Sequence, residues 1–187
     1  MMNSSLYPAF LRLDGLPAVV VGGGAVAAGK LDQLLAAGAR VTVIAPDIAP
    51  AIRERANVAR VERAFEPADL DDARWVIAAA TPAVNREVAA AAGARGLFVN
   101  AVDDKAAATA YLGGVVRRGD VAIAISTGGL APALAGLLRE ALDALLPHDV
   151  TRWTELAAVA RAEHKRDGVA MSARRPLLLR ALERLYA

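Results

Sequence analysis

The chain has 187 residues, of which 56% are hydrophobic, and its 22 basic and 20 acidic side chains give a formal net charge of +2. This length is enough for one domain with a small appendage and for a substantial apolar core. The absence of cysteine excludes disulfides, thiolate metal sites and a cysteine nucleophile. Aromatic residues make up only 4% and no stacking motif is present, so no nucleic-acid partner is expected.

The sequence carries no signal for a membrane or for export. No apolar run reaches the roughly 18 residues that a membrane-spanning helix needs, so no membrane partner is expected. Residues 1–10 lack a basic segment followed by a long apolar core, so no secretory signal is expected. Together with the lack of cysteine, these features predict a cytoplasmic protein. The two histidines, His148 and His164, predict no histidine-rich metal site.

The first half of the chain alternates between short β-branched runs and helical patterns. Strands are predicted within residues 17–23, 39–45, 58–65, 73–80 and 97–103, and helices across 25–37, about 48–56 and about 83–94. Most of these strands are apolar on both faces, which is typical of a parallel sheet covered by helices on either side. We therefore expect an α/β fold with a Rossmann-type, doubly wound parallel sheet.

The pattern changes after residue 103. Two β-like runs flank the sequence Arg-Arg-Gly-Asp at residues 117–120, which predicts a β-hairpin instead of a crossover helix. Only helices are expected beyond it, across 131–146, 149–166 and 172–187, with Ser172 as a plausible cap of the last one. The nucleotide-type domain is thus followed by a region built from a hairpin and helices.

The first glycine-rich turn has the sequence Gly22-x-Gly24-x-x-Ala27 and stands between a predicted strand and a predicted helix. This is the context that the dinucleotide-binding fingerprint requires. Gly22 permits the tight turn, Gly24 lets the backbone approach a pyrophosphate, and Ala27 permits close packing of helix on strand. The free N–H groups at the start of the helix then favour the phosphates. A nicotinamide dinucleotide is the expected cofactor.

The residue that should hold the cofactor's ribose is less clear. The second strand ends at Ile44-Ala45, where an acidic residue usually stands, and Asp47 follows slightly further on. Asp47 is therefore a candidate for the ribose, while capping of the next helix is an equal alternative. NAD is preferred over NADP on this basis alone, and Arg40 lies in a poor position for a 2′-phosphate.

Four motifs in this order carry a resemblance to a known family: "GGGAVAAGK", "VIAAATPAVN", "FVNAVDD" and "RRGDVAIAISTGGLAPALAGLLRE". The chain resembles the precorrin-2 dehydrogenase / sirohydrochlorin ferrochelatase family, whose unit also forms the N-terminal part of multifunctional siroheme synthases. The resemblance covers nearly the whole chain. The methyltransferase domain of the multifunctional enzymes is lacking, which indicates the stand-alone form.

The resemblance implies oxidation of precorrin-2 to sirohydrochlorin with NAD as hydride acceptor, and in some members ferrous iron insertion. It also implies a homodimer and three parts: an NAD-binding Rossmann domain at 1–102, a dimerisation region at 103–147 and a small helical domain at 148–187. Asp103 corresponds to the family's essential aspartate. Cofactor contacts are implied at Gly22, Gly24, Ala25, Val26, Pro46, Asp47 and Thr81. Substrate contacts are expected at Asn100, Ser126, Thr127, Gly128 and Gly129.

The chain departs from the family pattern at three positions. Gly29 stands where an arginine usually precedes the fingerprint Lys30, and a proline of the first hairpin strand is replaced around Gly113. Thr127 replaces the active-site serine that is phosphorylated in some members, with Ser126 beside it. The sequence leaves open whether Thr127 or Ser126 is modified, and whether the chain inserts metal.

The chemistry can also be argued from the residues themselves. Asp103 ends a predicted strand, and ligands of open parallel sheets bind at those carboxyl ends. It is placed to act as a general base, or to steer pyrrole N–H groups and an incoming metal. The alternative is that Asp103 or Asp104 caps the next segment, and Asp104 is the second candidate for the functional aspartate. Arg117 and Arg118 suit the carboxylates of a tetrapyrrole, although arginines at a hairpin tip are usually solvated. A non-catalytic NAD-sensing module and another small-substrate NAD(P) oxidoreductase are the alternatives.

Overall fold

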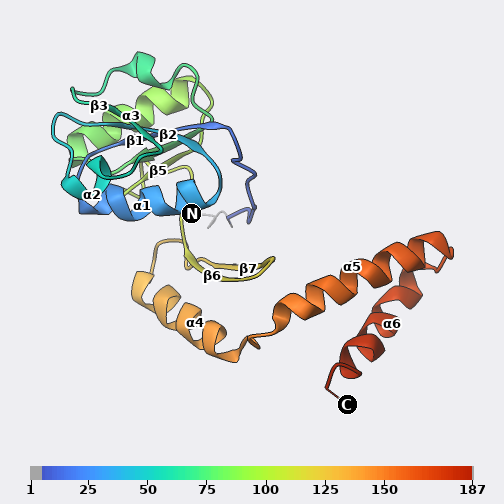
Figure 1. Ribbon diagram of the computed structural model, residues 1–187. Helices are drawn as coiled ribbons and strands as arrows, with labels where there is room; N and C mark the ends of the chain where they lie inside the picture. The colour runs from blue at the N-terminus through green and yellow to red at the C-terminus, as the bar shows by residue number, and fades with distance from the viewer. Residues whose placement is uncertain (1–5, 187) are drawn as a thin grey trace. The chain divides into compact units, whose positions relative to one another are not determined.

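The computed structural model describes residues 6–186, so the beginning of the segment considered for a secretory signal lies outside the described residues. The chain divides into two compact units between Leu112 and Gly113, and each is described by itself (Figure 1). No helix among the described residues is long and apolar enough to cross a membrane.

The first unit is built on a five-stranded sheet in which every neighbouring pair is parallel. Its strands are β1 (Pro17–Val21), β2 (Arg40–Ile44), β3 (Val58–Val61), β4 (Trp75–Ala78) and β5 (Val99–Ala101). Their order across the sheet is β3-β2-β1-β4-β5. The order reverses between β1 and β4, and at such a switch point the connections leave in opposite directions and open a crevice at the carboxyl ends of the strands.

Helices cover both faces of this sheet, as its two-sided apolar strands require (Figure 1). Residues of α1 (Ala25–Ala36) and the short α2 (Pro50–Arg53) pack on one face, together with alternate residues of β1 such as Val20. Residues of the 3₁₀ helix η1 (Pro67–Leu70) and α3 (Pro82–Ala94) pack on the other face, with Val19 and Val21. The expected α/β fold with a doubly wound parallel sheet is confirmed.

The second unit begins with the expected hairpin. Strands β6 (Gly114–Arg118) and β7 (Val121–Ile125) are antiparallel and joined at Gly119, whose φ is +56°. Three helices follow: α4 (Pro132–Leu145), α5 (Val150–Arg166) and α6 (Met171–Glu183). Trp153 of α5 meets Tyr186 edge to face with 6.2 Å between ring centroids, which ties the last helix back to the start of α5.

Arg118 fastens the hairpin to the end of α4 and is not solvated at the hairpin tip. Its Nη2 donates to the backbone oxygen of Asp143 at 3.1 Å and to Oδ1 of the same residue at 2.7 Å, and its Nη1 donates to the Leu146 carbonyl. These carbonyls belong to the end of α4, where helix carbonyls lack partners within the helix. The Arg118 side chain is accordingly only 17% exposed.

Two helices start elsewhere than the sequence pattern predicts. The helix expected at about 48–56 is reduced to α2, because the N–H of Ala49 donates to the carbonyl of Gly23 (2.9 Å) and holds residues 45–49 against the first glycine turn. Ser172 was expected to cap the last helix, but this is wrong: α6 has Ala170 as its N-cap, directly after the chain reverses at Gly168 (φ +66°). The division into three parts stays a prediction.

Candidate functional site

The first glycine turn is held between two neighbouring loops at the carboxyl ends of the strands. A Cβ on Gly22, whose φ is +124°, would lie 2.2 Å from the carbonyl oxygen of Ala79 in the turn after β4. A Cβ on Gly23 would lie 2.0 Å from the carbonyl oxygen of Asp47 after β2. Glycine is therefore required at both positions for packing, and Gly23 is a requirement that the fingerprint reading alone did not include.

Gly24 is different, because a Cβ placed on it would find no atom of the described residues within 4 Å. Gly24 is the N-cap of α1, no side chain caps this helix, and its first turn holds no acidic residue. The first-turn residues Ala25 and Val26 are exposed, whereas Ala27 is fully buried against the sheet. The site thus offers an open helix N-terminus beside a glycine without steric neighbours, which fits the pyrophosphate of a dinucleotide.

The loop after β2 approaches the same turn. Pro46 and Asp47 are exposed there, and the Asp47 backbone contacts the turn at Gly23. Asp47 does not cap α2, because Ala49 is the N-cap and no side chain caps that helix. Its carboxylate therefore remains a candidate for the ribose of the cofactor.

The turn after β4 completes the cofactor side. Thr81 is the N-cap of α3, and its Oγ1 accepts from the N–H of Val84 at 3.5 Å. Two residues beside it, Ala80 and Pro82, line a pocket. The role predicted for Thr81 toward the cofactor remains a prediction.

Asp103 and Asp104 follow β5 and differ in their surroundings. Oδ1 of Asp104 accepts from the N–H groups of Ala106 and Ala107, both at 3.1 Å, so Asp104 caps the following turn. Within residues 6–186, no hydrogen bond holds the Asp103 carboxylate. Asp103 has a φ of +57°, the left-handed region that few residues other than glycine occupy. The capping alternative therefore falls on Asp104, and Asp103 is left available for chemistry.

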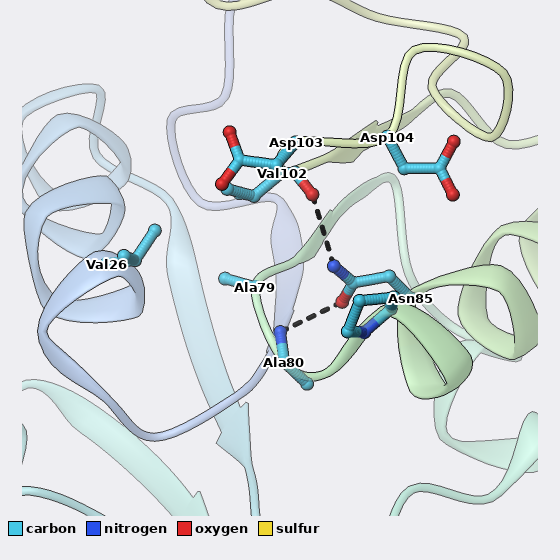
Figure 2. Close-up of a pocket in the computed structure, with 8 residues that line it drawn as sticks. Val26, Ala79, Ala80, Asn85, Val102, Asp103 and Asp104 are labelled. Atoms are coloured by element: carbon cyan, nitrogen blue, oxygen red, sulfur yellow. Dashed lines mark hydrogen bonds between the residues drawn. The ribbon is translucent and has the colours of Figure 1, made fainter.

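A pocket of about 220 Å³ brings these elements together (Figure 2). It is lined by Val26 of α1, Ala79 and Ala80 after β4, Pro82 and Asn85 of α3, and Val102, Asp103 and Asp104 after β5. The pocket thus joins the start of the fingerprint helix to the candidate base. Its lining combines apolar side chains with the Asp103 carboxylate, for which the described residues provide no hydrogen bond.

Asn85 is a functional candidate that the sequence reasoning missed. It is 3% exposed and both ends of its amide are used: Oδ1 accepts from the N–H of Ala80 at 2.9 Å, and Nδ2 donates to the carbonyl of Val102 at 3.3 Å (Figure 2). Two signals were available in the sequence: Asn85 ends the motif VIAAATPAVN, and it is a polar residue at a position of α3 that faces the sheet.

Asn100 lies outside the pocket lining. Its Nδ2 donates to the carbonyl of Ala110 at 2.9 Å, so its amide holds the segment that follows the candidate base. Its Oδ1 is buried and has no partner among the described residues. A buried acceptor without a donor is unfavourable, which leaves this oxygen available to a ligand or to water.

The second glycine turn belongs to the second unit. Gly128 (φ +61°) and Gly129 (φ +68°) both take left-handed conformations. The N–H of Gly128 donates to Oγ of Ser126 and the N–H of Ala131 donates to Oγ1 of Thr127, each at 3.2 Å. Both hydroxyls accept from the backbone and keep their own protons to donate, so the turn initiates α4 without losing its ability to bind an acceptor.

The tight turn, the open helix and the switch-point crevice place the first unit among nicotinamide-dinucleotide-binding Rossmann domains. The family described as "Putative NAD(P)-binding" matches residues 9–114, which confirms the prediction of an NAD-type cofactor. The family described as "Sirohaem biosynthesis protein central" matches residues 118–145. The chain belongs to the precorrin-2 dehydrogenase / sirohydrochlorin ferrochelatase family, which confirms the resemblance drawn from its motifs.

Individual relatives agree with this assignment. Siroheme synthase 1 of Aeromonas salmonicida is 39% identical over 94% of this chain and 38% of its own length, and siroheme synthase 2 of the same strain is 42% identical over 93% and 37%. The chain thus spans less than two-fifths of these curated relatives. A solved structure of SirC, precorrin-2 dehydrogenase, matches with a TM-score of 0.72 and 26% identity, over 94% of this chain and 88% of that chain.

Proposed function

We propose that this chain dehydrogenates precorrin-2 to sirohydrochlorin with NAD as hydride acceptor. The observation that carries the proposal is the pocket in which Asp103, whose carboxylate has no hydrogen bond to the described residues, lies together with Val26 of the fingerprint helix. The family membership and the likeness to a precorrin-2 dehydrogenase support this choice of substrate and reaction. Without the evidence of family membership, the pocket alone would support only the binding of NAD.

The residues around the first turn would hold the cofactor. The N–H groups of Gly24, Ala25 and Val26 would face the pyrophosphate, whereas Gly22 supplies the tight turn and donates its own N–H to the Ile44 carbonyl at 2.9 Å. Pro46 and Asp47 would contact the adenosine ribose, and Thr81 the nicotinamide end. The bound nicotinamide accepts a hydride. The chain supplies the fixed position of the reacting carbon, which is the main contribution that a protein makes to such a reaction.

Asp103 is the proposed general base. Loss of a hydride leaves the tetrapyrrole electron-poor, and loss of a proton completes the two-electron oxidation. A carboxylate is a suitable acceptor for that proton, because no side chain of the described residues already occupies it. General-base catalysis of this kind contributes about 10²–10⁴-fold to a rate.

The proposed substrate contacts are Asn100 and the second glycine turn. Oδ1 of Asn100 has no donor among the described residues, but it is buried and outside the pocket lining, so a contact with a pyrrole N–H requires a shift of the neighbouring residues when the substrate binds. The N–H of Gly129 and the hydroxyls of Ser126 and Thr127 would donate to substrate carboxylates, and Gly128 would shape the turn through its left-handed conformation. The proposal requires no modification of either hydroxyl.

The test is turnover by the purified protein. Incubation with precorrin-2 and NAD should produce the absorbance of sirohydrochlorin, with less activity when NADP replaces NAD. Absence of turnover with either cofactor, although NAD still binds, would favour a non-catalytic sensor. Turnover of a different small substrate would favour another oxidoreductase. A separate incubation of sirohydrochlorin with ferrous or cobaltous ion, compared with the spontaneous rate, tests metal insertion.

A further inference from the structure

Asn85 links two loops at the point where the sheet ends. β4 ends at Ala78 and β5 at Ala101, and the last backbone bond between these segments runs from the N–H of Val102 to the carbonyl of Ala78 (2.9 Å). Beyond it, the N–H of Ala80 and the carbonyl of Val102 are both satisfied by the amide of Asn85 (Figure 2). Buried backbone groups need such partners, so the Asn85 side chain takes the place of a direct backbone hydrogen bond between the two loops.

The two partners belong to different halves of the proposed site. Ala80 precedes Thr81 in the turn on the cofactor side, whereas Val102 directly precedes Asp103. Fixing the Val102 carbonyl fixes the plane of the peptide bond that leads into Asp103, which is one of the two peptide planes that define the left-handed φ of Asp103 (+57°). A non-glycine residue keeps such a conformation only where its surroundings hold it there.

We propose that Asn85 is a positioning residue that holds the Asp103 carboxylate at a fixed position relative to the turn after β4. It acts through the backbone of Val102, because no hydrogen bond among the described residues reaches the Asp103 carboxylate itself. The amide suits this task because it offers one acceptor and one donor on a short, buried side chain. The inference rests on the proposed function, since it assigns Asp103 a role in turnover.

The test compares Asn85→Asp with Val88→Ala, a second buried change on α3. Asn85→Asp keeps an acceptor for the Ala80 N–H but replaces the donor to Val102 by a second oxygen. Val88 is fully buried, and it does not line the pocket. Val88→Ala therefore lowers stability without touching either loop.

The expected result is a loss of single-turnover rate of about 100-fold in Asn85→Asp, because small misplacements of a reacting group cost that much. Its Kd for NAD should stay within a few-fold of the original value. Val88→Ala should keep the rate of the folded protein. If Asn85→Asp fails to fold, Asn85→Ser, which is too short to reach both partners, should show the same loss. An unchanged rate in a folded Asn85 variant would overturn the proposal.

A second measurement does not depend on activity. Backbone carbon chemical shifts of Asp103 report its φ, and they should move away from the left-handed pattern in Asn85→Asp but not in Val88→Ala. Unchanged shifts would refute the positioning role even if precorrin-2 is a substrate. Changed shifts in a protein that does not oxidise precorrin-2 would retain the positioning role and reject the proposed function.

Discussion

At the scale of single residues, the three consecutive glycines of the first turn have different roles. Gly22 and Gly23 are required by neighbouring carbonyl oxygens, whereas the space beside Gly24 is open. The first two therefore serve the fold, and Gly24 serves the ligand. This distinction separates folding from cofactor binding within one motif.

Gly24→Ala should leave the fold intact and weaken NAD binding. The added methyl meets no protein atom, and the residue's φ of −88° is accessible to alanine. It would occupy space that the pyrophosphate needs, so we expect the Kd for NAD to rise by at least about tenfold, which corresponds to roughly 1.4 kcal/mol. Titration calorimetry measures the Kd for NAD, and a thermal melt checks that the fold is intact. Unchanged NAD affinity in a folded Gly24→Ala variant would place the pyrophosphate elsewhere.

The neighbouring aspartates show where sequence reasoning stops. The motif indicated that Asp103 or Asp104 carries the chemistry, and capping by either was the alternative. The choice depends on which carboxylate meets the N–H groups of Ala106 and Ala107, and that follows from the backbone conformation at Asp103, which the sequence does not reveal. Asn85 was missed because its hydrogen-bond partners come from two separate loops, and the sequence does not reveal that these loops meet.

At the scale of elements, the strands were predictable because burial on both faces demands β-branched, apolar residues. The stop of α1 was equally clear, since Gly38 (φ +75°) follows the cap as a helix-ending glycine. The short α2 was not predictable, because its start is set by a contact with the turn at Gly23. Local patterns thus gave the elements, and contacts between elements set their ends.

Gly29→Ala should stabilise the first unit. Gly29 lies inside α1, is exposed, and leaves an added Cβ without a neighbour within 4 Å. Glycine inside a helix costs about 0.5–1 kcal/mol relative to alanine, so the free energy of unfolding should rise by that amount. Urea unfolding followed by Trp75 fluorescence in a Trp153→Phe background measures it. A decrease in stability would show that Gly29 has a packing role.

Arg118→Met should destabilise the second unit. The change removes the donors to the Asp143 and Leu146 carbonyls and the bond to the Asp143 carboxylate. Hydrogen bonds of charged groups contribute about 1.5–3 kcal/mol, and a loss of that order is expected. Trp153 fluorescence in a Trp75→Phe background reports the unfolding of this unit. Arg117→Met is the matched control, because Arg117 is exposed, and equal losses in the two variants would reject the capping role of Arg118.

At the scale of the whole molecule, the second unit holds a small core of its own. Among the residues described for it, the buried hydrophobic ones are Val116, Ala135 and Val150. Exposed leucines are frequent on α4 and include Leu137 and, at 77% exposure, Leu145. Such a surface needs a partner to cover it, and we propose a second copy of the chain, as the family resemblance implies.

Light scattering at micromolar concentration should therefore give about twice the chain mass of 19.4 kDa. Leu137→Glu should shift the mass toward that of one chain, because a carboxylate in an apolar interface is strongly unfavourable. Glu140→Gln, an exposed change on the same helix, should leave the mass of the original protein unchanged. A single-chain mass for the unaltered protein contradicts the proposed dimer.

Asp103 is the proposed base in an NAD-dependent oxidation of precorrin-2. The most direct measurement is the single-turnover rate of NADH formation with saturating NAD and precorrin-2, in Asp103→Asn and Asp104→Asn. Asparagine tolerates the left-handed backbone of Asp103, so Asp103→Asn should fold, bind NAD normally and lose about 10²-fold or more of the rate. Asp104→Asn should keep most of the rate. Full activity in Asp103→Asn would exclude Asp103 as the base.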